Sequence, residues 1–285
     1  MANKTVKEAE TISQSALDSG INYFDHADIY GRGESETIFS QAVKNLGIKR
    51  EDLIIQSKVG IRPDLGIYDF SYEHIINATK NILERLETDY LDVLLLHRPD
   101  TLMDPQEIAK AFKELYETKQ VRAFGVSNFT PMQIELLEKH IPYPLIINQV
   151  QLSIMHTPII DEGINLNHTP DKPIPYTGGL LEYSRLKDIT LQAWSPYQYG
   201  FFEGTFIDNP KFPLLNETLD KYAQKYHVTK TTIATAWILT HPANIQVIAG
   251  SMTPSRIKEI TQATDFKLTK VEWYDIYKSA GNILP

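Results

Sequence analysis

The chain of 285 residues carries a formal net charge of −8 at pH 7, and 42% of its residues are hydrophobic and 22% charged. This composition is typical of a folded globular protein and excludes a disordered chain, while the acidic balance disfavours a nucleic-acid partner. The absence of cysteine excludes disulfides, thiolate metal sites and cysteine nucleophiles. No apolar run is long enough to span a bilayer and the polar N-terminus lacks the apolar core of a signal peptide, so we expect a cytoplasmic protein without a membrane partner.

Short β-type runs alternate with longer amphipathic segments along the chain. We predict strands at 21–25, 52–58, 91–97, 121–128, 145–149, 188–194 and 244–251. We predict helices at 5–19, 34–46, 71–86, 105–118, 130–139, 177–186, 211–240 in two pieces, and 254–263. This alternation indicates a parallel sheet covered by helices, in either a closed barrel or an open doubly wound sheet. Because no linker or shift in composition divides the chain, we expect residues 1–285 to form a single domain.

Two further features concern the connections between these elements. Thr130-Pro131 and Thr253-Pro254 each follow a predicted strand directly and have a hydroxyl cap with proline at the first helical position. Residues 161–177 are rich in Asn, Pro and Gly and predict a long irregular loop, which in a compact domain is usually functional or mobile.

Polar and reactive side chains recur where the predicted strands end. They are Asp25, Lys58, His97, Ser127, Asn128, Gln149, Trp194, Ser195, Gly250 and Ser251. Taken singly, each has a simpler explanation, such as a loop cap for Asp25, a solvated strand end for Lys58 or a packed histidine for His97. In a barrel, however, these strand ends emerge on one face, where active sites are built.

An aspartate, a lysine, a tyrosine and a histidine at one site can donate a proton to a substrate. A tyrosine phenol gives up its proton reluctantly at neutral pH unless a neighbouring cation stabilises the phenolate. Lys58 would be that cation for Tyr30, Asp25 would hold Lys58 charged, and His97 would orient the substrate oxygen. None of the eight histidines forms a convincing ligand cluster with a second, so no metal is implied.

The sequence resembles the aldo-keto reductase family along nearly its whole length. The motifs are FDHADIYGRGESE (24–36), SKVG (57–60), LLLHRPD (94–100), GVSNF (125–129) and NQVQLS (148–153). The resemblance implies an α/β fold, the (β/α)8 TIM barrel, and a catalytic tetrad consisting of Asp25, Tyr30, Lys58 and His97. It also implies that Ser127, Asn128 and Gln149 bind the nicotinamide carboxamide and that Trp194 stacks on the nicotinamide ring.

The resemblance extends to the rest of the cofactor. AWSPYQYG (193–200) is similar to the segment that wraps the pyrophosphate, with Ser195 and Pro196 in the contacting positions. VIAGSMTPSRIKEI (247–260) is similar to the segment that grips the 2′-phosphate, with Gly250 standing where some members have Lys. There Arg256 and Ser251 would bind the phosphate at a helix N-terminus, which favours NADPH over NADH.

The start of the chain departs from the family pattern. Typical members have a strand before the first helix, and Met1 matches a point just past the loop that follows that strand. A barrel that lacks its first strand would expose backbone donors and acceptors on two strands, so we expect lowered stability or a compensating contact.

The resemblance implies an oxidoreductase that reduces an aldehyde or ketone to an alcohol with NADPH, with Tyr30 as general acid. We expect substrate choice to depend on residues 68–70, 161–177 and 197–206. Two alternatives remain open: an NADPH-binding regulatory subunit, like the potassium-channel β-subunits of the same superfamily, and a catalytically impaired, truncated barrel. The sequence names neither the carbonyl substrate nor the oligomeric state, so a monomer and a homo-oligomer both remain possible.

Overall fold

The protein is described by a computed structural model that covers residues 1–167, 173 and 175–284. Two compact units divide the chain, Met1–Asn148 and Gln149–Pro285. The expectation of a single domain stays a prediction. Within the described residues, no helix is long and apolar enough to cross a membrane.

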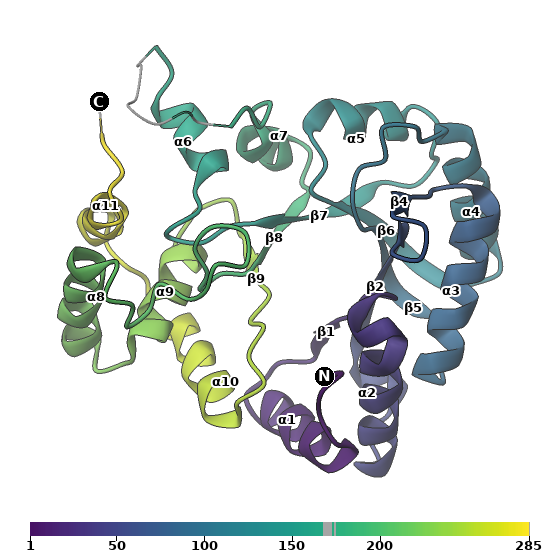
Figure 1. Ribbon diagram of the computed structural model, residues 1–285, viewed down its shortest axis with the longest axis horizontal. Helices are drawn as coiled ribbons and strands as arrows, with labels where there is room; N and C mark the ends of the chain where they lie inside the picture. The colour runs from purple at the N-terminus through teal and green to yellow at the C-terminus, as the bar shows by residue number, and fades with distance from the viewer. Residues whose placement is uncertain (168–172, 174, 285) are drawn as a thin grey trace. The chain divides into compact units, whose positions relative to one another are not determined.

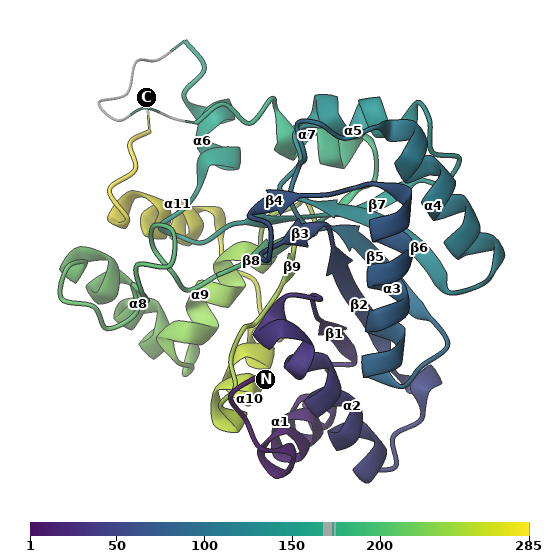
Figure 2. The ribbon, with the colours of Figure 1, turned by 45° about the vertical axis from the view of Figure 1, so that its right-hand side comes forward.

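The first unit is built on parallel strands that alternate with helices. Strands β1 (Tyr23–Asp25), β2 (Ile54–Val59), β5 (Leu91–Leu96) and β6 (Val121–Ser127) pair in this order. The helices are α1 (Val6–Asp18), α2 (Glu34–Asn45), α3 (Tyr72–Leu86), α4 (Pro105–Glu117) and α5 (Pro131–Glu138). In Figures 1 and 2, α2, α3 and α4 stand side by side along one face of these strands.

Local sequence explains why these elements form where they do. The run LDVLLL of β5 is almost continuously apolar and almost entirely buried, as expected for a parallel strand covered on both faces. Helix α1 begins at Thr5 with a capping box to Glu8. Helix α5 begins at Thr130 with a second capping box, to Gln133, and with proline at its first position.

An arginine and aspartate network joins β2, β5 and β6 at their amino ends. Arg50 donates to Asp92 Oδ2 at 2.7 Å and to the carbonyl oxygens of Leu53 and Tyr90 at 2.8 and 3.0 Å. Arg122 pairs with the other oxygen of Asp92 at 3.0 Å. The guanidinium carbons of Arg50 and Arg122 lie 3.9 and 3.7 Å from the centre of the Tyr90 ring. Functional groups gather at the carboxyl ends of parallel strands, whereas this network lies at the amino ends. Its position therefore indicates a role in stability.

The second unit is mainly helical. Strand β7 (Leu145–Gln151) runs across the boundary between the units, and β8 (Thr190–Trp194) pairs in parallel with β9 (Gln246–Val247). The helices are α6 (Pro158–Ile164), α7 (Leu180–Leu186), α8 (Pro213–Tyr226), α9 (Lys230–Leu239), α10 (Pro254–Thr261) and α11 (Lys270–Ser279). In its core Trp237 and Trp273 stack with ring centres 4.7 Å apart. Each indole N–H donates to the backbone carbonyl of the other residue, at 3.1 and 2.9 Å.

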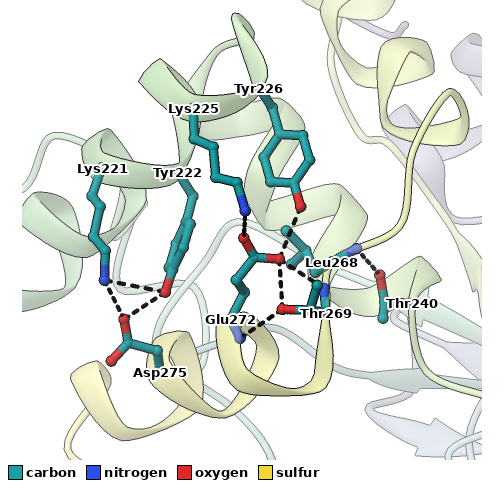
Figure 3. A network of polar contacts seen from close by, with 9 residues as sticks. All are labelled: Lys221, Tyr222, Lys225, Tyr226, Thr240, Leu268, Thr269, Glu272 and Asp275. Carbon is teal, nitrogen blue, oxygen red and sulfur yellow. Dashed lines mark hydrogen bonds and ion pairs between the residues drawn. The ribbon is translucent and has the colours of Figure 1, made fainter.

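Helices α8 and α11 are joined by polar contacts around Glu272 (Figure 3). Glu272 is buried and accepts hydrogen bonds from the Lys225 ammonium, the Tyr226 hydroxyl and the Thr269 backbone N–H. The same carboxylate closes a capping box with Thr269 at the start of α11. One side chain therefore both caps its own helix and anchors that helix to α8.

The structure contains a strand at each predicted position, but it departs from the predictions in three places. Strand β9 has two residues where we predicted 244–251, and left-handed residues, Asn244 and Gly250, lie on either side of it. Residues 161–164 belong to α6, so the prediction of a loop was wrong there, and residues 168–172 and 174 lie outside the described residues. A hairpin of β3 (Ile61–Arg62) and β4 (Ile67–Tyr68), which lies beyond the carboxyl end of β2 in Figure 2, was not predicted.

Candidate active site

The ammonium of Lys58 is the centre of the candidate site in the first unit. Its side chain is fully buried near the carboxyl end of β2. The nitrogen donates to Asp25 Oδ2 at 2.7 Å, to the His26 carbonyl oxygen at 2.9 Å and to Tyr30 Oη at 3.2 Å. Three acceptors match the three N–H groups of an ammonium, which offsets much of the cost of burying the charge.

Asp25 keeps this lysine charged. Burial alone would lower the pKa of Lys58, but attraction to Asp25 and to the Tyr30 oxygen outweighs burial and raises the pKa above its ordinary value. The second oxygen of Asp25 accepts a hydrogen bond from Gln56, and Gln56 accepts one at 2.7 Å from the Tyr23 hydroxyl. The carboxylate is thus held from two sides.

Tyr30 reaches the site from a tight turn after β1. Its backbone N–H donates to the Ala27 carbonyl at 3.0 Å, and the next three residues all have positive φ. At Gly33 a Cβ would lie 2.7 Å from the Arg85 side chain, so this position of the turn requires glycine. The tyrosine itself is 37% exposed, which leaves its ring open to a ligand.

His97 follows β5 directly and is buried. Its ring meets the Tyr30 ring edge to face with centres 5.9 Å apart. Burial, and after it the nearby charge of Lys58, lowers the pKa of His97 to about 3, so the imidazole is neutral near pH 7. The buried Nδ1 has no hydrogen-bond partner among the described residues. A neutral imidazole can donate a hydrogen bond to a substrate oxygen without carrying charge.

Ser127 and Asn128 lie at the end of β6, in the same unit. Ser127 is buried, and its hydroxyl oxygen accepts a hydrogen bond from the Asn128 carboxamide at 2.8 Å. Asn128 has φ of 65°, one of the uncommon left-handed positions outside glycine. Such backbone conformations concentrate at ligand sites, which is consistent with the predicted role in cofactor binding.

The remaining predicted residues belong to the second unit. The buried Gln149 donates to Gln192 at 3.0 Å, and Gln192 donates to Gln246 at 3.0 Å, so three carboxamides form a chain across β7, β8 and β9. Trp194 ends β8 and is half-buried. Ser195 has φ of 51°, and Pro196 is buried behind it.

The last group of predicted residues lies in α10 and in the segment that precedes it. Gly250 has φ of 59°, and Ser251 Oγ accepts a hydrogen bond from the Thr253 N–H at 3.3 Å. Arg256 is exposed in the first turn of α10. The predicted hydroxyl cap at Thr253 was wrong, because the Thr253 side chain makes no capping hydrogen bond to this helix. Uncapped N–H groups with an arginine beside them suit a phosphate.

The sequence profile of the Aldo/keto reductase family matches residues 2–280. The chain belongs to the aldo-keto reductase family. Oxidoreductase YdhF of Escherichia coli strain K12 is 34% identical and is aligned over 98% of this chain and 89% of its own length. Uncharacterized oxidoreductase YcsN of Bacillus subtilis strain 168 is 35% identical over 95% of this chain and 88% of its own length. A solved thermostable aldo-keto reductase, in complex with the inhibitor epalrestat, has a TM-score of 0.75 at 27% identity and covers 96% of this chain and 86% of its own.

This aldo-keto reductase is therefore an oxidoreductase by family, and its fold is the TIM-barrel type that the sequence predicted. Sequence reasoning missed two groups that touch these residues: the Gln56 side chain, which donates to Asp25, and the His26 carbonyl, which accepts from Lys58. The sequence did contain a signal for Gln56. Side chains two positions apart on a strand lie on the same face of the sheet, and Gln56 is two positions before Lys58. The contribution of the His26 carbonyl had no such signal, since any residue supplies a backbone oxygen.

Proposed function

We propose that this aldo-keto reductase reduces an aldehyde or a ketone to an alcohol with NADPH, with Tyr30 as the proton donor. The observation that carries the proposal is the buried Lys58 ammonium, which lies 3.2 Å from Tyr30 Oη and 2.7 Å from Asp25. A buried cation beside a phenol stabilises the phenolate and so makes proton donation easier at neutral pH. Cofactor binding alone does not need this arrangement.

Each member of the tetrad then has one task. The Tyr30 phenol gives its proton to the carbonyl oxygen of the substrate, and the Lys58 ammonium faces the phenolate that is left. Asp25 keeps Lys58 charged and in place. His97, neutral and next to the Tyr30 ring, donates a hydrogen bond to the same substrate oxygen and orients it.

The residues that would hold the cofactor fit an NADP-type dinucleotide in their chemistry. Ser127, Asn128 and Gln149 offer hydroxyl and carboxamide groups to the nicotinamide carboxamide, and Trp194 offers a half-buried ring for stacking. Ser195 and Pro196 would lie against the pyrophosphate. Gly250, Ser251 and Arg256, at the uncapped start of α10, would take the 2′-phosphate. NADPH, when bound, supplies the hydride that adds to the carbonyl carbon.

A Tyr30→Phe variant tests the proposal, with Tyr116→Phe as a matched control because Tyr116 is an exposed tyrosine of α4. We expect Tyr30→Phe to lose at least about 100-fold in carbonyl reduction while keeping its affinity for NADPH. Turnover is followed by loss of NADPH absorbance with para-nitrobenzaldehyde. Unchanged turnover in Tyr30→Phe would refute the mechanism.

Cofactor affinity is read separately, from tryptophan fluorescence. Trp237 and Trp273 are buried and stacked on each other, so we expect quenching by NADPH to come from Trp194 and to disappear in Trp194→Phe. Saturable quenching that prefers NADPH to NADH supports the assignment of Arg256 and Ser251.

A second candidate is an NADPH-binding regulatory subunit. It is favoured by relatives such as a protein of Arabidopsis thaliana named as a probable voltage-gated potassium channel subunit beta, which is 29% identical over 91% of this chain. Slow turnover combined with tight retention of NADPH would favour this candidate, whereas rapid multiple turnovers favour the enzyme. The contacts of Lys58 with Asp25 and Tyr30 favour the enzyme, for which we expect a small carbonyl compound as substrate and a cytoplasmic location.

A further inference from the structure

A buried acidic group lies behind the tetrad, on the other side of β2. Glu36 of α2 is fully buried and accepts hydrogen bonds from Ser57 Oγ and Arg85 Nε, both at 2.7 Å. Ser57 precedes Lys58 in β2, and adjacent side chains of a strand point to opposite faces. Glu36 and Arg85 therefore pack against the outer face of the strand whose inner face presents Lys58.

Asp28 belongs to the same group and lies two residues before Tyr30. Its backbone N–H donates to the Lys58 carbonyl oxygen at 3.2 Å, which ties the turn that carries Tyr30 to β2. Its carboxyl group accepts a hydrogen bond from the Ile29 backbone, but the buried Oδ1 has no hydrogen-bond partner among the described residues. An ionised carboxylate with an unsatisfied buried oxygen is costly.

The charges around Asp28 increase this cost. Glu36, whose own pKa is raised by burial, repels the ionised form of Asp28 when it is itself ionised, while Arg85 and Lys58 attract that form. Arg85 already pairs with Glu36, with Nη2 at 2.7 Å from the carboxylate, and Lys58 already pairs with Asp25. Burial first, and then the Glu36 charge, raise the pKa of Asp28 from 3.8 to about 7. Asp28 therefore changes its charge near neutral pH, far above the range of an exposed aspartate.

We propose that Asp28 is a positioning residue for proton transfer by Tyr30, and that its protonation state controls how readily the phenol gives up its proton. The inference rests on the proposed reductase function. Neutral Asp28 adds no charge near Lys58, the ammonium that donates to Tyr30 Oη. Ionised Asp28 adds a negative charge that disfavours the phenolate of Tyr30, so the phenol becomes a weaker proton donor.

The pH profile of carbonyl reduction should therefore contain a step that belongs to Asp28. With saturating NADPH and para-nitrobenzaldehyde, we expect kcat to fall roughly threefold as pH rises through the ionisation. The midpoint of this step should lie at about pH 7. An Asp28→Asn variant, which cannot ionise, should lack the step and keep the higher rate of the acidic side. Glu51→Gln, which removes an exposed carboxylate from the same unit, should keep the step and control for the change in net charge.

A second variant tests the electrostatic cause. Glu36→Gln removes the repelling charge and frees Arg85 to attract Asp28, so the step should move to lower pH. The ionisation can also be followed without catalysis, by carboxyl-carbon NMR of the chain alone, with the Asp28 signal identified by its loss in Asp28→Asn. We expect that signal to titrate at about pH 7.

The outcomes separate the two proposals. A step that survives in Asp28→Asn, or an Asp28 signal that titrates in the ordinary aspartate range, overturns the role of Asp28 and leaves the reductase function intact. Absence of carbonyl reduction in the unmodified chain overturns both, even if the NMR signal titrates as expected. Loss of the step in Asp28→Asn together with its shift in Glu36→Gln supports the inference.

Discussion

Replacing Glu272 with glutamine removes one buried negative charge from the junction of α8 and α11 while keeping the shape of the side chain (Figure 3). The carboxylate accepts hydrogen bonds from the Tyr226 hydroxyl at 2.8 Å and from the Thr269 N–H and hydroxyl at 2.7 and 2.9 Å. It also pairs with the Lys225 ammonium. Glutamine offers a single acceptor oxygen to these four donors, so at least one of them loses its partner.

The pKa of Glu272 indicates the size of the effect. Burial favours the neutral acid, but the hydrogen bonds from Lys225, Thr269 and Tyr226 outweigh it and lower the pKa from 4.5 to about 2. Such a shift corresponds to about 3 kcal/mol of preference for the ionised form. The Lys225 side chain is 56% exposed, so solvent screens the part of this preference that comes from the Lys225 charge. Glutamine also keeps one or two hydrogen bonds worth about 1 kcal/mol each. We therefore expect Glu272→Gln to lower the free energy of unfolding by about 2 kcal/mol at neutral pH.

Tryptophan fluorescence in urea measures this loss, because all three tryptophans, Trp194, Trp237 and Trp273, belong to the second unit. Asp275→Asn on the same helix is the matched control. It weakens a solvent-exposed pair with Lys221 and a hydrogen bond from the Tyr222 hydroxyl at 2.7 Å, from which Asn can still accept, and should cost at most about 1 kcal/mol. If Glu272→Gln costs no more than Asp275→Asn, the carboxylate does not anchor α11 and the reasoning is wrong.

The loss also depends on pH in a definite direction. The folded pKa of Glu272 lies below the unfolded value, so its stabilisation is fully present above about pH 4.5 and is lost as pH falls towards about 2. The difference between the unmodified chain and Glu272→Gln should therefore shrink across this range. A difference that stays constant from neutral to acidic pH would contradict the electrostatic explanation.

Two predictions concern the stability of the first unit and are measured by circular dichroism during thermal unfolding. Gly60 has φ of 110°, and a Cβ there would lie 1.9 Å from the buried Phe70 ring, so Gly60→Ala should cost more than about 2 kcal/mol. Gly47→Ala, where φ is 67° and no atom lies within 4 Å, should cost only about 1 kcal/mol, and equal losses would refute the steric argument. Asp92→Asn weakens the largely buried pair with Arg50 and should cost about 2 kcal/mol. If Asp92→Asn costs less than Gly47→Ala, the network of Arg50, Asp92 and Arg122 at the amino ends of the strands contributes little to stability.

Short strands were harder to predict than long strands and helices because their few residues carry no local pattern of their own. The strand β5 and the helix α5 follow from apolar runs and from a Thr-Pro start that lie within the elements themselves. The β3 and β4 strands have two residues each, half-buried in β3 and exposed in β4, so no periodic pattern marks them. Strand β9 looked longer because NIQVIAGS contains Ile245, Val247 and Ile248, yet left-handed residues, Asn244 and Gly250, lie on either side of the two residues that pair.

The sequence by itself predicted which groups do the chemistry, because residue type, order and resemblance to a family pointed to Asp25, Tyr30, Lys58 and His97. It also determined the alternation of strands and helices, since burial on both faces requires continuous apolar runs. Only the tertiary structure decided how charged these groups are. The neutral state of His97 and the near-neutral pKa of Asp28 arise from burial and from charges brought together from distant parts of the chain, and no local pattern encodes that proximity.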